Sequence, residues 1–372
     1  MPNPFTPTFG VTPPLLVGRD DPLIDFRATL GAAPGDPNRA ILLTGMRGSG
    51  KTVLLNAFED EARARRWAVI SETTRPGIAG EIAATVLPEL LAEATGHRTT
   101  TTVEGVNVSA GGFGAGVTRR RRERYQPAPS LRSQLTELAD RYDEHGRGVL
   151  LSLDEIHREA AEDLRAIAQA VQHLFREGRQ LAFVAAGLPS AIDGVLSDAV
   201  LTFLRRAERF HLGAVPPVDV ALALRQPIEA SGRSITDEAL AVAAAATQGY
   251  PFLIQLVGYH MWAVDPGADT IDARQARAGA ERAMRRIGRL VNEPALADLS
   301  AVDRQFLLAM AADAGPSRMV DIATRMGVSR SYASQYRLRL IAAEMIVPTG
   351  RGFVDFNVPY LRDYLLGSAQ GR

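Results

Sequence analysis

The chain contains no cysteine and, among its 42 basic residues, a single lysine. The lack of cysteine excludes disulfide bonds and metal sites built on thiolates. The 42 acidic residues balance the basic ones, so no overall charge draws the protein to DNA or to a membrane surface. No apolar run approaches the ~20 residues of a membrane-spanning helix, and the N-terminus lacks the basic and apolar regions of a signal peptide. We therefore expect a cytoplasmic protein that makes no membrane contact.

The single lysine, Lys51, lies in a glycine-rich stretch that fits the phosphate-binding pattern G-x-x-x-x-G-K-[ST]. An apolar run (40–43) precedes the stretch and a helical run follows it, as the pattern requires. Glycines allow backbone N–H groups to converge on phosphate oxygens, and the helix start adds partial positive charge. A compact ammonium enters such a loop more readily than a planar guanidinium, which explains the one lysine in an arginine-rich chain. The residues expected to bind nucleotide here are Gly45, Met46, Arg47, Gly48, Ser49, Gly50, Lys51, Thr52 and Val53.

A pair of acidic residues completes this predicted site. We expect Lys51 to reach the β- and γ-phosphates of ATP and the Thr52 hydroxyl to bind Mg²⁺. A second apolar run (148–153) ends in Asp154-Glu155, at the predicted carboxyl edge of a buried strand. Asp154 suits Mg²⁺ coordination there, and Glu155 suits deprotonation of the attacking water. The alternative is that this Asp-Glu pair only caps a helix.

Strand and helix patterns alternate as far as residue 215, which predicts an α/β fold with a parallel sheet. The other strands are expected at 67–71, 181–187 and 210–215. From residue 216 the pattern turns helical, with helices predicted at 218–230, 236–247, 251–264 and 272–291 before Pro294 breaks the chain. We therefore divide the chain into an α/β core (1–215), a helical lid (216–293) and a C-terminal domain (294–372).

Residues 96–128 interrupt the alternation with threonines, glycines and a run of arginines. The pattern predicts a β-hairpin with a basic end that includes Arg120, Arg121 and Arg122. This segment is either a solvated insertion or a basic finger that reaches nucleic acid or a neighbouring subunit.

Residues 299–366 have a pattern of their own, with helices predicted at 301–312, 319–326 and 329–343, then two short strands around Gly350 and a last helix. This order predicts a winged helix-turn-helix. The third helix carries small polar, amide and arginine side chains of the types that contact bases and phosphates. Such domains also bind proteins, so double-stranded DNA and a protein partner both remain candidates. The candidate DNA contacts are Arg330, Ser331, Tyr332, Gln335 and Arg337.

Together these features resemble the AAA+ ATPases, a class of P-loop ATPases. Within that class the chain resembles the branch shared by STAND ATPases and origin-recognition-like replication initiators, which have a C-terminal winged helix. Residues 45–52 resemble the Walker A motif, and residues 150–155 resemble Walker B. The resemblance implies that Val17, Gly18 and Arg19 pack on adenine.

The resemblance also implies two further contacts to the nucleotide. Gly249-Tyr250-Pro251 is similar to the G-x-P turn that STAND proteins place over the nucleotide, so Tyr250 and Pro251 are candidate ligands. A helix boundary with proline in its first turn is the other interpretation of this motif. The cluster of Arg205, Arg206 and Arg209 lies where the family places an arginine finger, with Arg206 as the first choice.

An arginine finger acts on a neighbouring subunit, so it implies a homo-oligomer, whereas ordinary surface arginines imply nothing. The expected catalytic residues are thus Glu155, Lys51 and Arg206. Two departures from the family favour slow turnover: the strand ending at Gly187 lacks a polar end residue, with Ser190 the nearest hydroxyl, and the lid lacks an obvious arginine.

We expect a slow ATPase that acts as a nucleotide-dependent switch and binds ATP or ADP. One alternative is an ATP-dependent DNA-binding or DNA-loading protein of the replication-initiator or transposition-helper type. The other is an adaptor, bound to an unknown protein, that holds nucleotide without hydrolysing it.

The predicted role of Glu155 is tested by Glu155→Gln, which keeps the side chain's size and removes its basicity. We expect ATP binding to persist while turnover falls by about 10²–10⁴-fold, the usual contribution of a general base. Phosphate release and ATP affinity are measured on the same preparation. Unchanged turnover in the variant would falsify this role.

Overall fold

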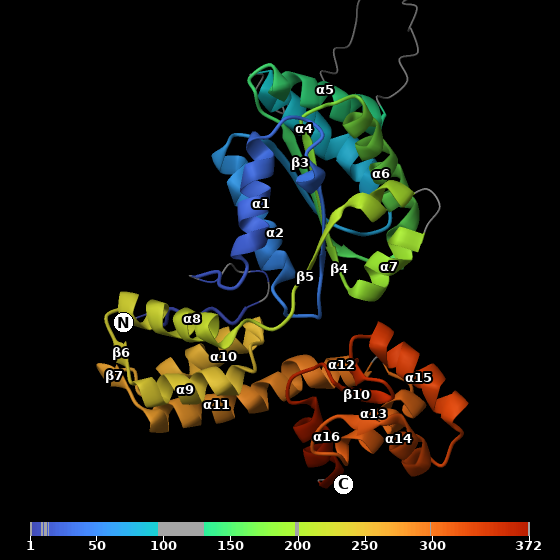
Figure 1. The fold of residues 1–372 in the computed structure, drawn as a ribbon. Helices are drawn as coiled ribbons and strands as arrows, with labels where there is room; N and C mark the ends of the chain where they lie inside the picture. Colours follow the sequence, from blue (N-terminus) through green and yellow to red (C-terminus); the bar gives the residue numbers. More distant parts are fainter. Residues whose placement is uncertain are drawn as a thin grey trace, which may run out of the picture.

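The computed structural model describes residues 2–8, 10, 13, 15–95, 130–197, 201–297 and 299–370. Among these residues a five-stranded sheet, with all its strand pairs parallel, has the order β2-β3-β4-β1-β5 (Figure 1). The segment 96–128, including Arg120, Arg121 and Arg122, lies outside the described residues. The strands are β1 (Ala40–Thr44), β2 (Ala68–Thr73), β3 (Val149–Ile156), β4 (Leu181–Gly187) and β5 (Glu208–His211).

Helices cover both faces of the sheet, which is why the central strands β1 and β4 are nearly continuous apolar runs. Along β1 the side chains alternate: Ile41 and Leu43 pack in the apolar cluster under α1 and α2, and Leu42 packs in the cluster on the opposite face. One face holds α1 (Asp20–Gly31) and α2 (Lys51–Ala64). The other face holds α3 (Ile78–Glu81), α4 (Leu87–Ala94), α5 (Leu131–Asp143), α6 (Ala161–Arg176) and α7 (Pro189–Ser197).

A helical unit follows β5 and has an apolar cluster of its own. The N-terminal arm docks on this unit, because the Phe5 ring is buried against Gly258 and the Thr6 amide donates to Gln255 at 3.1 Å. The sequence indicated only an extended arm. The helices of the unit are α8 (Pro217–Ala230), α9 (Asp237–Thr247), α10 (Pro251–Trp262) and α11 (Ala273–Ile287), with the short parallel pair β6 (Ser234–Ile235) and β7 (Thr270–Ile271) beside them.

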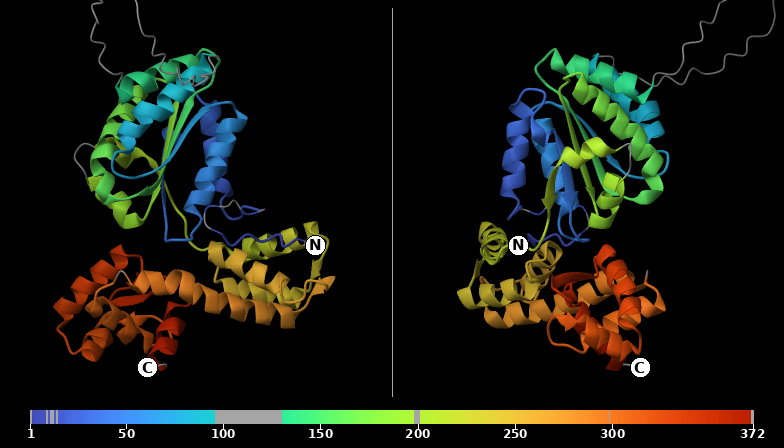
Figure 2. Two further views of the ribbon diagram at one scale, coloured as in Figure 1. Left: turned by 180° about the vertical axis from the view of Figure 1, so that it is seen from behind. Right: turned by 45° about the vertical axis from the view of Figure 1, so that its right-hand side comes forward.

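The last unit has the predicted order of helices and strands, with one additional short strand, β8, which pairs with β10. Its small sheet has the order β8-β10-β9. Figure 2 shows this unit beside the helical unit, below the sheet edge at which β1 ends. The elements are α13 (Ala301–Ala311), β8 (Ser317–Arg318), α14 (Met319–Met326), α15 (Arg330–Ala342), β9 (Ile346–Gly350), β10 (Phe353–Phe356) and α16 (Leu361–Gln370).

The structure confirms the α/β class with a parallel sheet and corrects two local predictions. The predicted strand 210–215 is instead β5, which ends at His211, because Gly213 bonds back to His211 in a tight turn. Pro294 does not break the chain: α11 continues through a π-helical segment (Gly288–Asn292) into α12 (Glu293–Ala297), where Pro294 lies in the first turn and tolerates helical geometry. No helix in the described ranges has the length and apolar character needed to cross a membrane.

Candidate functional site

The loop between β1 and α2 lies at the carboxyl edge of the sheet, where Thr44 of β1 is in register with Gly187 of β4 and His211 of β5. Helix α2 begins at Lys51, and Gly50 adopts the left-handed backbone (φ 91°) that turns the chain into it. The first N–H groups of a helix have no partner within it, and they carry partial positive charge. The loop therefore directs unpaired donors toward one point at the edge of the sheet.

Donors from three parts of the chain hold the carbonyl groups of this loop. The Lys51 ammonium donates to the carbonyls of Gly45 and Met46 at 2.6 and 2.9 Å. The Arg19 guanidinium donates to the Ser49 carbonyl at 3.3 Å, and the Tyr250 hydroxyl donates to the Arg47 carbonyl. Because its carbonyls are engaged in this way, the loop presents N–H groups to an anion. Burial lowers the pKa of Lys51.

Tyr250 joins the helical unit directly to the loop. It caps the N-terminus of α10, and a Cβ atom at Gly48 would overlap its hydroxyl, so the contact requires glycine there. Burial raises the pKa of Tyr250, which therefore stays a neutral donor. Gly249, with a left-handed φ of 70°, lies so close to the Val215 carbonyl that a side chain would clash. Pro251 follows in the first turn of α10, so the motif is both a helix boundary and a loop contact.

Arg19 braces the loop rather than presenting a free charge. Its side chain is buried and donates to the carbonyls of Gly18, Ser49 and Gly213, at 3.1, 3.3 and 2.7 Å. Burial lowers the pKa of Arg19. Val17, beside it, packs against the apolar cluster of the helical unit. These contacts bring the segment around residues 17–19 to the loop and tie it to the chain just after β5.

The acid pair at the end of β3 lies next to the first turn of α2. The Thr52 hydroxyl donates to Asp154 at 2.6 Å, although α2 and β3 are far apart in sequence. Glu155 is exposed and has a left-handed φ of 53°, at a register shift between Leu153 and Ile156 in the pairing of β3 with β4. Such strained backbone is uncommon outside glycine and tends to occur at functional positions. A hydroxyl beside a carboxylate suits Mg²⁺, which takes oxygen ligands.

A cavity of about 300 Å³ opens beside the loop where the three units meet. Met46 and Ser49 line it from the loop, and Gln248 and Tyr250 line it from the helical unit. The C-terminal unit contributes Glu344, which the sequence analysis missed because an isolated glutamate carries no motif. Burial raises the pKa of Glu344 to about 7, and Lys51 opposes this shift.

Other predicted residues lie away from the cavity. Arg206 is exposed at the end of a 3₁₀ turn before β5, and neither it nor Glu155 lines the cavity. Of its neighbours, Arg205 donates to the Leu196 carbonyl at 2.8 Å. On α15, the side chains of Arg330, Ser331, Tyr332 and Gln335 are exposed and that of Arg337 is partly buried. They form a separate surface from the loop.

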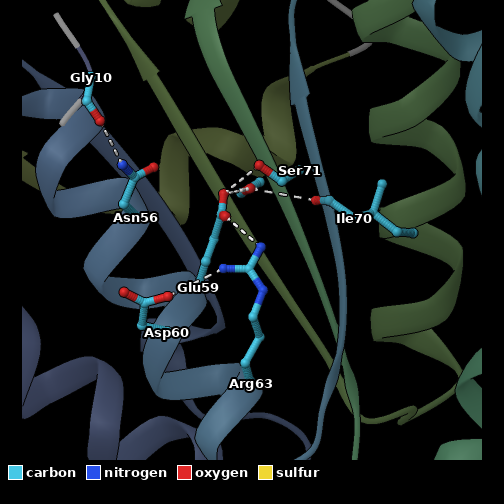
Figure 3. A network of polar contacts seen from close by, with 8 residues as sticks. Gly10, Asn56, Glu59, Asp60, Arg63, Ile70 and Ser71 are labelled. Carbon is cyan, nitrogen blue, oxygen red and sulfur yellow. Dashed lines mark hydrogen bonds and ion pairs between the residues drawn. The ribbon is translucent and has the colours of Figure 1, made fainter. Parts of the chain in front are cut away.

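A buried polar network supports α2 from below, and sequence patterns did not reveal it (Figure 3). Glu59 is buried on α2 and accepts hydrogen bonds from Ser71 of β2 at 2.6 Å and Ser152 of β3 at 2.5 Å. Arg63 pairs with the same carboxylate at 2.9 Å. Ser152 precedes Asp154 by two residues on β3. This network and the Thr52–Asp154 bond therefore join α2 to β3 at two points. Together these hydrogen bonds fix the position of α2 relative to Asp154 and Glu155.

These features define a P-loop nucleotide-binding fold. Residues 15–184 match the family described as "AAA ATPase domain", which confirms the resemblance to AAA+ ATPases that the motifs predicted. Residues 290–365 match a domain of unknown function (DUF8462). A comparison with curated protein sequences gives no match.

Solved structures resemble this chain to different degrees. The Walker-type ATPase PABY2304 of Pyrococcus abyssi superposes with a TM-score of 0.65 at 17% identity, covering 94% of this chain and 96% of that one. The RuvB Holliday junction branch migration motor of Thermotoga maritima has a TM-score of 0.44 at 17% identity, covering 94% and 95%. The Aeropyrum pernix Orc1 protein in complex with DNA has a TM-score of 0.42 at 17% identity, covering 96% and 94%. Only the first likeness is strong enough to show a common fold.

The Glu59 network predicts that replacing Glu59 lowers the free energy of unfolding more than replacing its neighbour Asp60 does. Glu59→Leu strands the buried hydroxyl of Ser152 and should lower the free energy of unfolding by about 1–3 kcal/mol, whereas the exposed Ser71 hydroxyl can bond water instead. Asp60→Ala removes the other, exposed partner of Arg63 and should cost less than about 1 kcal/mol. Urea denaturation measures both values.

Adding Ser152→Ala to Glu59→Leu should recover part of the loss, because it removes one stranded hydroxyl. Equal costs for Glu59→Leu and Asp60→Ala, or fully additive effects in the double variant, would show that the network does not couple helix and strand.

Proposed function

We propose that this protein binds ATP with Mg²⁺ and hydrolyses it slowly, as a switch that controls its C-terminal unit. The observation that carries the proposal is the loop itself: its carbonyls are engaged by Lys51, Arg19 and Tyr250, and its N–H groups lie beside the Thr52–Asp154 pair. In this assignment the loop amides and Lys51 bind the phosphates. Thr52 and Asp154 hold the metal, which neutralises phosphate charge, and Glu155 takes the proton of the attacking water.

Slow turnover is supported by what surrounds the acid pair. β4 is buried along its whole length and ends in Gly187, so it offers no polar side chain at its carboxyl end to sense the γ-phosphate. Arg206 is exposed and can act as a finger only on a second copy of the chain. The proposal therefore assigns full activity to a homo-oligomer and low activity to a monomer.

We divide the chain into an ATPase core (1–215), a helical lid (216–293) and a winged helix-turn-helix (294–372). The apolar clusters support this division, since the core, the lid and the C-terminal unit each have their own. The Tyr360 hydroxyl donates to the Ala246 carbonyl at 2.7 Å, which links the C-terminal unit to the lid. We propose that nucleotide binding at the loop is coupled to the C-terminal unit through this hydrogen bond and through the cavity.

The exposure of α15 favours double-stranded DNA as a partner of the C-terminal unit. Arg330 and Gln335 are free to meet phosphates and base edges, and Tyr332 lies beside Tyr336, with the ring centroids 5.0 Å apart. A protein partner on the same surface is the competing assignment.

Because Lys51 is the only lysine, amine-reactive reagents modify this side chain and the N-terminus alone. ATP with Mg²⁺ should protect Lys51 from modification. Lys51→Ala should weaken ATP binding by about 10–100-fold, the value of a charged hydrogen bond. Lys51→Arg should also weaken it, since a guanidinium does not fit the loop.

Calorimetry measures ATP affinity, with Arg65→Ala as the control that removes a cation from the same helix away from the loop. Absence of ATP binding by the unmodified protein, or full affinity in Lys51→Ala, would refute the proposed site.

DNA binding is tested by fluorescence anisotropy at several salt concentrations. Arg330→Ala should weaken duplex binding and reduce the salt slope by about 1, as expected for the loss of one phosphate contact. Arg65→Ala should have no effect. An unchanged slope in Arg330→Ala, or no duplex binding with ATP present, would favour the protein partner.

A further inference from the structure

Glu344 is an unusual residue to find beside a phosphate loop. It lies in the C-terminal unit between α15 and β9, only 8% exposed, and it lines the same cavity as Met46 and Ser49. Among the described residues its Oε2 atom has no hydrogen-bond partner. A buried carboxyl without full pairing costs free energy, so its position requires an explanation.

The backbone fixes Glu344 where it is. Its φ of 57° is left-handed, which is uncommon for glutamate, and its carbonyl accepts a hydrogen bond from the Asn357 side chain at 3.0 Å. Its N–H donates to the Ile341 carbonyl at 3.0 Å. Glu344 is therefore held rigidly within the C-terminal unit, and it can move away from the loop only if that unit moves.

Lys51, in the loop beside the cavity, is the positive charge that acts on Glu344. Among the acidic groups that raise the pKa of Lys51, Glu344 acts more strongly than Asp154 or Glu155. The acidic group that acts most strongly on the loop lysine is thus a carboxyl from another unit. A triphosphate bound to the loop would bring several negative charges into the same enclosed space, and like charges at such range repel.

We propose that Glu344 is an internal competitor for the phosphate groups, so that a bound triphosphate displaces its carboxyl and with it the C-terminal unit. This inference rests on the proposed function and names its regulation. It makes nucleotide binding and the docked position of the C-terminal unit mutually unfavourable. By linkage, whatever holds the C-terminal unit in place weakens ATP binding by the same factor.

The first test is calorimetry of ATP with Mg²⁺ on the full chain at about pH 8, above the pKa of about 7 that burial gives Glu344, so that its carboxyl is charged. Glu344→Gln keeps the shape of the side chain and removes its charge, and we expect about tenfold tighter ATP binding, within the usual range of coupling between sites. Asp321→Asn removes a charge from α14 of the same unit, outside the cavity, and should leave affinity unchanged. Unchanged or weaker binding in Glu344→Gln would overturn the proposal, the latter by making Glu344 a supporting ligand.

The second test follows the position of the C-terminal unit. The absence of cysteine allows a dye pair to be placed at Glu89→Cys on the core and Arg351→Cys on the C-terminal unit, both exposed positions. ATP should change the energy transfer between the dyes, and the change should be smaller when Glu344→Gln is added, because no repulsion remains to move the unit. An equal change with and without Glu344→Gln would overturn the proposal.

The third test needs no nucleotide and so separates this inference from the proposed function. Without the Glu344 carboxylate the pKa of Lys51 should fall, so amine-reactive reagents should modify Lys51 faster in Glu344→Gln than in the parent chain or in Asp321→Asn. Faster modification together with no ATP binding would refute the proposed function while upholding the electrostatic interaction of Glu344 with Lys51. Equal rates would show that Glu344 does not act on Lys51.

Discussion

The structure depends on holding one ammonium group inside a loop of backbone carbonyls. Removing a charge from water is costly unless hydrogen bonds replace the water, and the Gly45 and Met46 carbonyls do this for Lys51. The same contacts orient the loop, because a carbonyl engaged by a cation leaves the amide groups of its peptide chain available to an anion. Arg19 and Tyr250 extend this arrangement to the other loop carbonyls, from the N-terminal segment and from the helical unit.

The loop is therefore a meeting point of distant segments rather than an autonomous motif. The helix that follows the loop, α2, is hydrogen-bonded to β3 at two points: Thr52–Asp154 near the loop and Glu59–Ser152 deeper in the core. The left-handed backbone of Glu155 lies at the strand end so positioned. The hydrogen bonds of α2 to β3 hold the helix in place, and those of Arg19 and Tyr250 hold the loop from other parts of the chain. A site that binds a highly charged ligand needs such support.

Local charge explains how binding could reach the C-terminal unit. Glu344 lines the cavity beside the phosphate loop, and both it and Lys51 are largely removed from water, so the interaction between their charges is stronger than in water. The links of the C-terminal unit to the lid, through Tyr360 and through the continuous helical path of α11 and α12, hold it near the loop without making it part of the core. A switch needs such a unit, whose position can change while each apolar cluster stays intact.

The sequence by itself determined the class of fold, the phosphate loop and the neighbouring acid pair. These are local patterns: strand-length apolar runs, glycines at set spacing around one lysine, and an acidic strand end. The tertiary structure decided the rest. Phe5, Glu59 and Glu344 are ordinary residues in sequence, and each acquired its role from partners far along the chain. Burial and pairing arise only when separate elements meet, so no local pattern could have revealed them.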